Sequence, residues 1–560
     1  MTPAALWKDF DVSAAETDIS IVRDEVNDGI KARSFYFTAL KSGDAVVRCY
    51  VSVKCREADL RLSAKLPALI SLSRRNEGGR LTDTVLSQGY ADVCIDFGGA
   101  APGKSRFTIY PPEFGYADLA NYKSGKLNFE DLYRVKKSAK ETAWYVWAAM
   151  TRRAVTIIRG LDFIDKNKIG LIGSEYGANV VWNVIGTDLR LAAAAAINTT
   201  GLENGYLYSV GKTAADAEPD EENALYRSAL GVSGYIPYAN CPTLAHSGTN
   251  TRDNIFDRAS VALARFPGKF PMLLSVSPRL GTETGFYEVR NIVNWFACRF
   301  SDAPRVPDMP IVTVEIKNGK LGVSLRSDSR FTVDTVKIFY AYDEPAPAQR
   351  NWFEARASRA EDDSYYAEPA AYSADGYFFC FGTVRYTSGF SVSSLLNVSI
   401  PEGATPVPLK KCRMIYDAKT MGLDCFTAET GKAAHDRPEV TLEESPVGIG
   451  GVTAEEGALV SYKLSDPRFF APTAEAALTV AFFSASEQDV TFAVTEFTDG
   501  KEGDTYRKSL RAPALDVWQK TVLTLGDFKT DGKRPLGKWD AVKKISILSE
   551  GILLGTLLWV

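Results

Sequence analysis

The segment KIGLIGSEYGANVVW, residues Lys168–Trp182, predicts a buried strand that turns sharply into a helix. KIGLIG is a short apolar run of the kind found in parallel strands covered on both faces, and the residues after the turn suit a helix. Gly173 and Gly177 flank the turn, where we expect close packing to exclude larger side chains. Glu175 is the middle residue of this turn, so the sequence predicts an acidic side chain between strand and helix.

The neighbouring segments predict a mostly parallel sheet. ALISLS (residues 68–73) and ADVCIDF (residues 91–97) are further apolar runs, and a short helix is predicted between them. Residues 138–160 predict a long helix, with Ser138 as the first residue of a capping box and Gly160 as its stop. Strands and helices alternate to residue 300, an order typical of a sheet with helices on both faces.

An N-terminal β extension is predicted before the parallel strands. Residues 34–55 form a hairpin pattern, so residues 1–64 are expected to be a β extension packed on an α/β domain of residues 65–302.

Two all-β domains are predicted to follow. A proline-rich stretch at residues 301–310 predicts a linker, and shorter alternating strands come after it. We therefore predict a β-sandwich at residues 310–402 and a second one at residues 405–560.

Composition limits the possible partners and cofactors. The chain has 560 residues, 65 basic and 69 acidic side chains, and a formal net charge of −4. No basic block could neutralise a run of phosphates, so no nucleic-acid partner is expected. No leader pattern or long apolar run is present, which predicts a cytoplasmic protein without membrane contact. Eight scattered cysteines and only two histidines predict reduced thiols, no metal and no cofactor.

Residues from about 65 to 300 resemble the α/β-hydrolase fold, in particular its acetyl-xylan-esterase and dienelactone-hydrolase branch. The likeness is carried by the strand–turn–helix of KIGLIGSEYGANVVW and covers a little under half of the chain. In that family the turn reads G-x-S-x-G and carries the catalytic serine. Here the pattern falls on residues 173–177, which puts Glu175 at the nucleophile position and Ser174 one residue early.

The other two positions of the family's catalytic triad also depart from the pattern. The resemblance implies a histidine after the last strand, yet residues 277–290 contain none. His246 lies in the preceding strand, PTLAHSG, where a histidine usually packs or makes a hydrogen bond. The implied acid position is Thr251, with Asp253 two residues later. A serine without an adjacent base is a weak nucleophile, so a serine esterase mechanism is not expected.

Three interpretations remain open for the turn. In the first, it persists as architecture, and Glu175 is a binding or structural carboxylate in a protein without a working triad. In the second, Glu175 works with Asp253 or Glu283 as an acid/base pair of a hydrolase. In the third, the protein is a non-enzymatic carbohydrate-binding or scaffold protein. The ligand implied by the resemblance is a small ester or a carbohydrate, and the sequence does not indicate an oligomeric state.

Several other residues are candidates for the site. Gly78 and Gly79 follow a strand where this fold supplies an oxyanion-hole amide, although they could equally form only a turn. Tyr176 follows Glu175, and Tyr110 lies in an aromatic loop of residues 98–122 that could line a pocket or only shield the core.

The two β domains add one more prediction. The middle one resembles an immunoglobulin-like sandwich, and the last one resembles a galactose-binding-type jelly roll, as found in carbohydrate-binding modules. Trp518 and Trp539 are candidate sugar contacts there, with core packing as the expected alternative.

Overall fold

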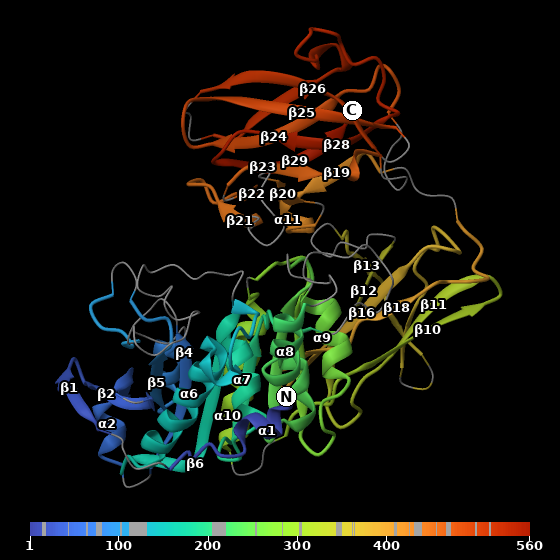
Figure 1. Ribbon diagram of the computed structural model, residues 1–560. Helices are drawn as coiled ribbons and strands as arrows, with labels where there is room; N and C mark the ends of the chain where they lie inside the picture. Colours follow the sequence, from blue (N-terminus) through green and yellow to red (C-terminus); the bar gives the residue numbers. More distant parts are fainter. Residues whose placement is uncertain are drawn as a thin grey trace.

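The chain forms one α/β domain and two β-sandwiches (Figure 1). The computed structural model describes residues 1–13, 18–42, 44–62, 65–73, 81–100, 104–110, 132–203, 220–251, 255–282, 284–301, 305–342, 350–360, 362, 364–407, 412–424, 426–429, 440–454, 456–465, 472–498, 501–513 and 517–560. Asp253, Glu283, Gly78 and Gly79 lie outside these residues.

The α/β domain is built on a sheet that has nine strands within the described part of the chain. In spatial order they are β1 (Ser20–Asn27), β2 (Ile30–Ser42), β3 (Ala45–Arg56), β5 (Ala91–Asp96), β4 (Leu66–Ser73), β6 (Ile164–Ser174), β7 (Ala193–Ile197), β8 (Thr243–Gly248) and β9 (Met272–Ser277). The pairs from β1 to β5 are antiparallel, and those from β5 to β9 are parallel. This is the α/β-hydrolase fold predicted from the sequence, and the hairpin predicted at residues 34–55 is confirmed as β2 and β3.

Helices cover both faces of this sheet. Within the described residues, the helices of this domain are α1 (Pro3–Trp7), α2 (Glu57–Leu60), α3 (Thr82–Ser87), α6 (Ala143–Arg159), α7 (Tyr176–Ile185), α8 (Glu221–Ala229), α9 (Ile255–Leu263) and α10 (Phe286–Phe300). Side chains of β4 alternate between two apolar clusters: Ile70 belongs to the cluster that contains α6 and α7, and Leu69 to the one that contains α3 and α10. Burial on both faces explains why the parallel strands are continuous apolar runs.

The long helix begins later than predicted. We expected it to start after Ser138, but α6 starts at Ala143, and the Thr142 hydroxyl accepts the hydrogen bond of the first turn. Ser138 instead caps a separate short 3-10 helix, Ala139–Glu141. The predicted start is therefore wrong because Thr142 has an extended backbone that separates the two helices. Gly160 ends the helix as predicted.

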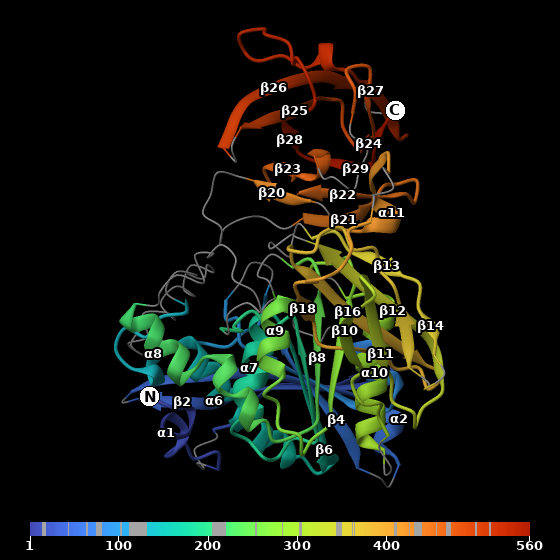
Figure 2. The same ribbon diagram turned by 90° about the vertical axis from the view of Figure 1, so that its right-hand side faces the viewer.

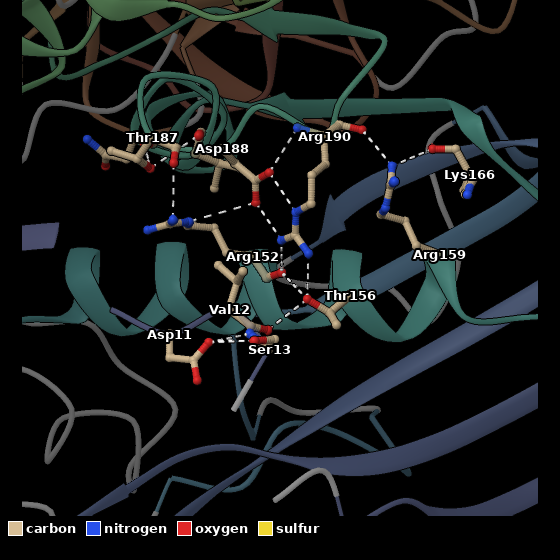
Figure 3. A network of polar contacts seen from close by, with 12 residues as sticks. Asp11, Val12, Ser13, Arg152, Thr156, Arg159, Lys166, Thr187, Asp188 and Arg190 are labelled. Atoms are coloured by element: carbon tan, nitrogen blue, oxygen red, sulfur yellow. Dashed lines mark hydrogen bonds and ion pairs between the residues drawn. The ribbon is translucent and has the colours of Figure 1, made fainter. Parts of the chain in front are cut away.

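The N-terminal segment is fixed on α6 by polar contacts (Figure 3). Thr156 of α6 donates a hydrogen bond to the backbone oxygen of Val12 at 2.8 Å. The same hydroxyl accepts one from Arg190 at 2.6 Å, and the guanidinium of Arg190 also donates two hydrogen bonds to the Asp188 carboxylate. Arg152 donates to the backbone at Thr187 and stacks over the Trp7 ring. These contacts attach the start of the chain to the α/β domain.

The middle β-sandwich shares its core with the α/β domain. One of its sheets contains β10 (Ile311–Lys317), β11 (Lys320–Arg326), β15 (Tyr365–Ala367) and β14 (Ser358–Arg359); the other contains β13 (Phe353–Ala355), β12 (Val333–Tyr342), β16 (Phe378–Tyr386), β17 (Ser391–Ser393) and β18 (Asn397–Ser399). Phe381 and Trp352 belong to the cluster of α6 and α7, whereas Leu325 belongs to that of α10. The linker near residue 305 is thus not a boundary between separate cores.

The C-terminal sandwich has a core of its own. One sheet contains β21 (Val440–Glu444), β22 (Gly450–Ala454), β29 (Ile552–Trp559), β24 (Leu478–Ser484), β27 (Gln519–Leu523) and β19 (Met414–Asp417); the other contains β20 (Thr427–Glu429), β23 (Ala458–Ser461), β28 (Val542–Ile547), β25 (Gln488–Thr498) and β26 (Lys501–Ala512). The two sheets bury a single cluster of side chains from residues 415–559. The predicted domain boundaries themselves stay a prediction.

One short helix of this sandwich faces the remainder of the molecule. Both ribbon views show α11 (Ala418–Met421) on the side toward the α/β domain (Figures 1 and 2).

In the part of the chain that the structure covers, no helix combines the length and the apolar character needed to cross a bilayer.

Candidate functional site

The turn after β6 has the geometry of a nucleophile elbow, and we call residues 173–177 the elbow. β6 ends at Ser174, α7 begins at Tyr176, and Glu175 alone joins them with φ 53° and ψ −115°. A positive φ is strained for a residue with a side chain, and such strain concentrates at functional sites. The Glu175 amide donates to the backbone oxygen of Ile197 in β7 at 2.8 Å, which anchors the apex to the sheet.

The two glycines of the elbow are not equivalent. A Cβ on Gly173 would lie 2.3 Å from the backbone oxygen of Gly177, so no side chain fits there. A Cβ on Gly177 would meet Leu72 at 3.4 Å and Phe97 at 3.7 Å, which are ordinary contacts. The predicted steric need for glycine is thus confirmed for Gly173 and wrong for Gly177, because the first turn of α7 leaves room for a methyl group.

The carboxylate of Glu175 is available to a ligand. Glu175 is half-buried, and none of the residues that the structure describes gives its carboxylate a hydrogen bond or an ion pair. The Ser174 hydroxyl likewise has no such partner within the described chain. Ser174 is the last residue of β6 and pairs with Ile197, so it stands before the apex, as the sequence register predicted.

His246 is part of a different network. It lies within β8 with 3% of its surface exposed, and its Nε2 is 2.8 Å from the Ser277 hydroxyl at the end of β9. Leu244, two residues earlier on the same face of β8, packs in the cluster of α10. The imidazole therefore lies on the α10 face of the sheet rather than beside the elbow apex.

A buried carboxyl group lies close to this histidine network. Glu288 in the first turn of α10 is 7% exposed, and desolvation raises its pKa to about 7, although Arg385 opposes the shift. The Ser277 hydroxyl also forms a hydrogen bond with Glu288. Ser277 is fully buried, and His246, Ser277 and Glu288 together connect β8, β9 and α10.

The structure describes only some of the residues at the family's acid and histidine positions. Thr251, at the acid position, is buried, and Asp253 lies outside the described residues, as does Glu283. The loop after β9 instead carries Arg279, with a φ of 61°. The proposed pairing of Glu175 with either carboxylate therefore stays a prediction.

Aromatic side chains border the elbow. The ring centroids of Tyr176 and Trp144 in α6 are 5.9 Å apart. Trp144 also contacts Trp147, and Trp147 contacts Phe97 at the end of β5. The Tyr110 hydroxyl donates to the Phe97 backbone oxygen at 2.7 Å. The two tyrosines proposed from the sequence thus belong to one aromatic cluster, which begins at the first residue after Glu175.

The structure adds Asn198 and Asn179, which the sequence reasoning missed. Asn179 in α7 accepts hydrogen bonds from the amides of Thr200 and Gly201, and so ties α7 to the loop after β7. Asn198 follows Ile197 directly, has a φ of 51°, and donates through Nδ2 to the backbone oxygen of Thr282 at 2.6 Å. An asparagine just after an apolar strand is a signal for such a left-handed residue.

The predicted sugar contacts of the C-terminal sandwich have different surroundings. Trp539 is 3% exposed and packs against Trp559 in the core, as the alternative interpretation expected. Trp518 is half-buried over Gly451 and Gly555, where the absence of side chains makes room for the indole ring. Sugar binding by this sandwich stays a prediction.

No group of residues that could hold a metal ion is found among the described residues.

Comparison of this chain with known proteins finds likenesses among solved structures. No protein-family model and no curated protein matches it. Among solved structures it is similar to acetyl xylan esterase 1 from Thermoanaerobacterium sp. JW/SL YS485, with 12% identity, a TM-score of 0.37, and coverage of 53% of this chain and 93% of that one.

Two further solved structures are similar at the same level. The glucuronoyl esterase from Solibacter usitatus matches with 10% identity and a TM-score of 0.34, over 53% of this chain and 91% of that one. A putative dienelactone hydrolase from Klebsiella pneumoniae subsp. pneumoniae MGH 78578 matches with 14% identity and a TM-score of 0.30, over 48% and 98%. At these values the likeness supports no function, and the fold assignment rests on the strand order and the elbow.

Proposed function

We propose that the α/β domain is a hydrolase-fold domain of the carbohydrate-esterase and dienelactone-hydrolase type that has lost its Ser-His-Asp triad. In this proposal the elbow binds a small ester or carbohydrate and does not hydrolyse it by a serine mechanism. The observation that carries it is the placement of Glu175, a carboxylate without a partner among the described residues, at the strained apex. His246, whose Nε2 is bonded to Ser277 on the α10 face, supplies no base to that apex.

The chemistry of the apex supports binding rather than acyl transfer. A carboxylate accepts hydrogen bonds, and hydroxyl groups of a sugar donate them. Tyr176, the half-buried residue directly after Glu175, offers an aromatic ring beside this acceptor, the combination found in small-molecule sites. Ser174 has no adjacent base in the described chain, and its hydroxyl stays a weak nucleophile.

The first test separates a serine esterase from the proposed binder. We expect no labelling by a fluorophosphonate and no turnover of 4-nitrophenyl acetate. Labelling that disappears in Ser174→Ala would overturn the proposal and its register. Turnover that survives Ser174→Ala and is lost in Glu175→Gln would establish the carboxylate mechanism instead.

The second test measures binding. Acetylated and unmodified xylo-oligosaccharides serve as probes, followed by isothermal titration calorimetry. Glutamine keeps one neutral acceptor oxygen, and a hydrogen bond to a charged acceptor contributes about 1–1.5 kcal/mol more than one to a neutral acceptor, so Glu175→Gln should weaken binding roughly 5- to 12-fold. Glu221→Gln, at an exposed position in α8, is the matched control and should bind as the wild type does. Equal affinity of both variants would show that Glu175 does not contact the ligand.

A further inference from the structure

Arg279 joins the α/β domain to both sandwiches. It lies in the loop after β9, and its guanidinium donates to the backbone oxygen of Thr420 in α11 at 2.6 Å. The same group donates twice to the backbone oxygen of Trp352, just before β13, at 3.2 and 2.8 Å. Its Nε is also 3.4 Å from a carboxylate oxygen of Asp424. One side chain thus contacts all three domains.

Residues 422–424 of the C-terminal sandwich form the other side of this junction. Asp424 is fully buried, and its carboxylate accepts the Trp352 amide at 3.0 Å. The Leu423 amide donates to the backbone oxygen of Arg279 at 2.9 Å. Gly422 has a φ of 57°, and a Cβ there would lie 2.5 Å from that same oxygen. The chain after α11 therefore packs directly against the backbone of Arg279.

Residues 278–282, which we call the docking loop, are also tied to the carboxyl edge of the sheet. The Arg279 amide donates to the Thr249 hydroxyl at 2.7 Å, and the Asn250 amide donates to the backbone oxygen of Leu280 at 2.9 Å. A Cβ on Gly248 would lie 1.8 Å from the backbone oxygen of Gly281. The docking loop thus rests on the end of β8 without room for movement toward it.

The far end of the docking loop reaches the elbow. The backbone oxygen of Thr282 accepts the side-chain amide of Asn198, which is 1% exposed. Asn198 follows Ile197, whose backbone oxygen holds the Glu175 amide, and Ile197 pairs with Ser174. The path from the Leu423 amide to the apex therefore runs along the backbone of residues 279–282, through the Thr282–Asn198 hydrogen bond, and from Ile197 through its hydrogen bond with the Glu175 amide.

We propose that the C-terminal sandwich and the elbow are coupled through the docking loop. Docking of residues 420–424 on Arg279 holds the docking loop in the position from which Thr282 fixes Asn198 beside Glu175. Undocking releases the loop and loosens the hydrogen bonds of Asn198 and Glu175 to their neighbouring strands. Because coupling is reciprocal, any ligand that orders the elbow also strengthens docking. The coupling does not depend on which ligand the elbow takes.

The test uses the full chain and hydrogen exchange of single amides. Arg279→Asn removes the guanidinium, and asparagine accepts the positive φ at this position. Asp424→Asn perturbs the same junction from the other domain. Arg330→Asn is the control, because Arg330 also pairs with carboxylates, Asp308 and Asp328, but makes none of the junction contacts. Arg279→Lys measures how much a simple positive charge restores.

We expect the Leu423 amide to exchange at least tenfold faster in Arg279→Asn, and the Asn198 and Glu175 amides to follow it. Asp424→Asn should shift the same three amides, Arg330→Asn none of them, and Arg279→Lys should restore part of the protection. Amides in the centre of α6 should keep their wild-type exchange, which separates coupling from general destabilisation. Faster exchange at Leu423 with unchanged Asn198 and Glu175 would refute the coupling. Unchanged Leu423 in both junction variants would refute the docking itself.

Discussion

Gly173→Ala tests whether the elbow depends on backbone packing between β6 and α7. The added Cβ would lie 2.3 Å from the Gly177 oxygen and 2.9 Å from the Ala178 nitrogen. Both are backbone atoms in the first turn of α7, so only a shift of the whole helix relieves the contact. The required shift is about 0.7 Å or more, and overpacking of this kind costs about 3 kcal/mol.

Gly177→Ala is the matched control. The same methyl group is added four residues later, where its nearest neighbour is the Leu72 side chain at 3.4 Å. The first turn of α7 also gains helix propensity from alanine, worth up to about 1 kcal/mol. We therefore expect the free energy of unfolding to change by less than about 1 kcal/mol in this variant, in either direction.

Hydrogen exchange of the α7 amides measures the difference locally. The three apolar clusters of this chain need not unfold together, so exchange at single amides assigns the loss of stability to α7, whereas a global transition averages over the chain. A loss of about 3 kcal/mol corresponds to roughly 150-fold faster exchange, against less than about fivefold for the control. Equal effects of the two substitutions, or wild-type exchange in Gly173→Ala, would refute the steric account of the elbow.

Three further predictions concern the groups that hold the domains together. Asp257 and Arg350 form a fully buried ion pair between α9 and the middle sandwich, so Asp257→Asn should lower the free energy of unfolding in urea by about 3–5 kcal/mol. The double variant Asp257→Asn with Arg350→Met should recover part of this loss. An equal loss in the single and the double variant would contradict the pairing. Burial raises the pKa of Glu288 to about 7, so the folded state binds this proton more tightly than the unfolded state does. The free energy of unfolding should therefore fall by about 3 kcal/mol as the pH rises from about 4.5 through 7. Glu288→Gln should flatten this part of the profile of melting temperature against pH, and an unchanged slope would contradict the prediction. Trp539→Ala should destabilise the C-terminal sandwich by about 3–5 kcal/mol and leave exchange in the centre of α6 unchanged, because the two cores are separate; faster exchange there would show that they are not.

Local pattern predicted the architecture of the α/β domain well. The parallel strands at residues 68–73 and 91–97 are continuous apolar runs because both of their faces are buried, and such runs are readable without a structure. The elbow could also be predicted from the sequence, because the need for glycine at Gly173 and the residue order around it follow from local backbone geometry. Ser138 shows the limit, since a capping signal specifies that a helix starts nearby but not which of two adjacent caps begins the long helix.

The sequence by itself determined the strand–turn–helix, the acidic residue at its apex, and the absence of a histidine from residues 277–290, because each is a property of neighbouring residues. Only the tertiary structure decided that His246 bonds to Ser277 on the α10 face, and that Arg279 meets Trp352 and Asp424. These contacts join residues tens to more than a hundred positions apart, and local preference does not encode which distant segments meet. They depend on how whole sheets and helices pack, within the α/β domain for His246 and between domains for Arg279.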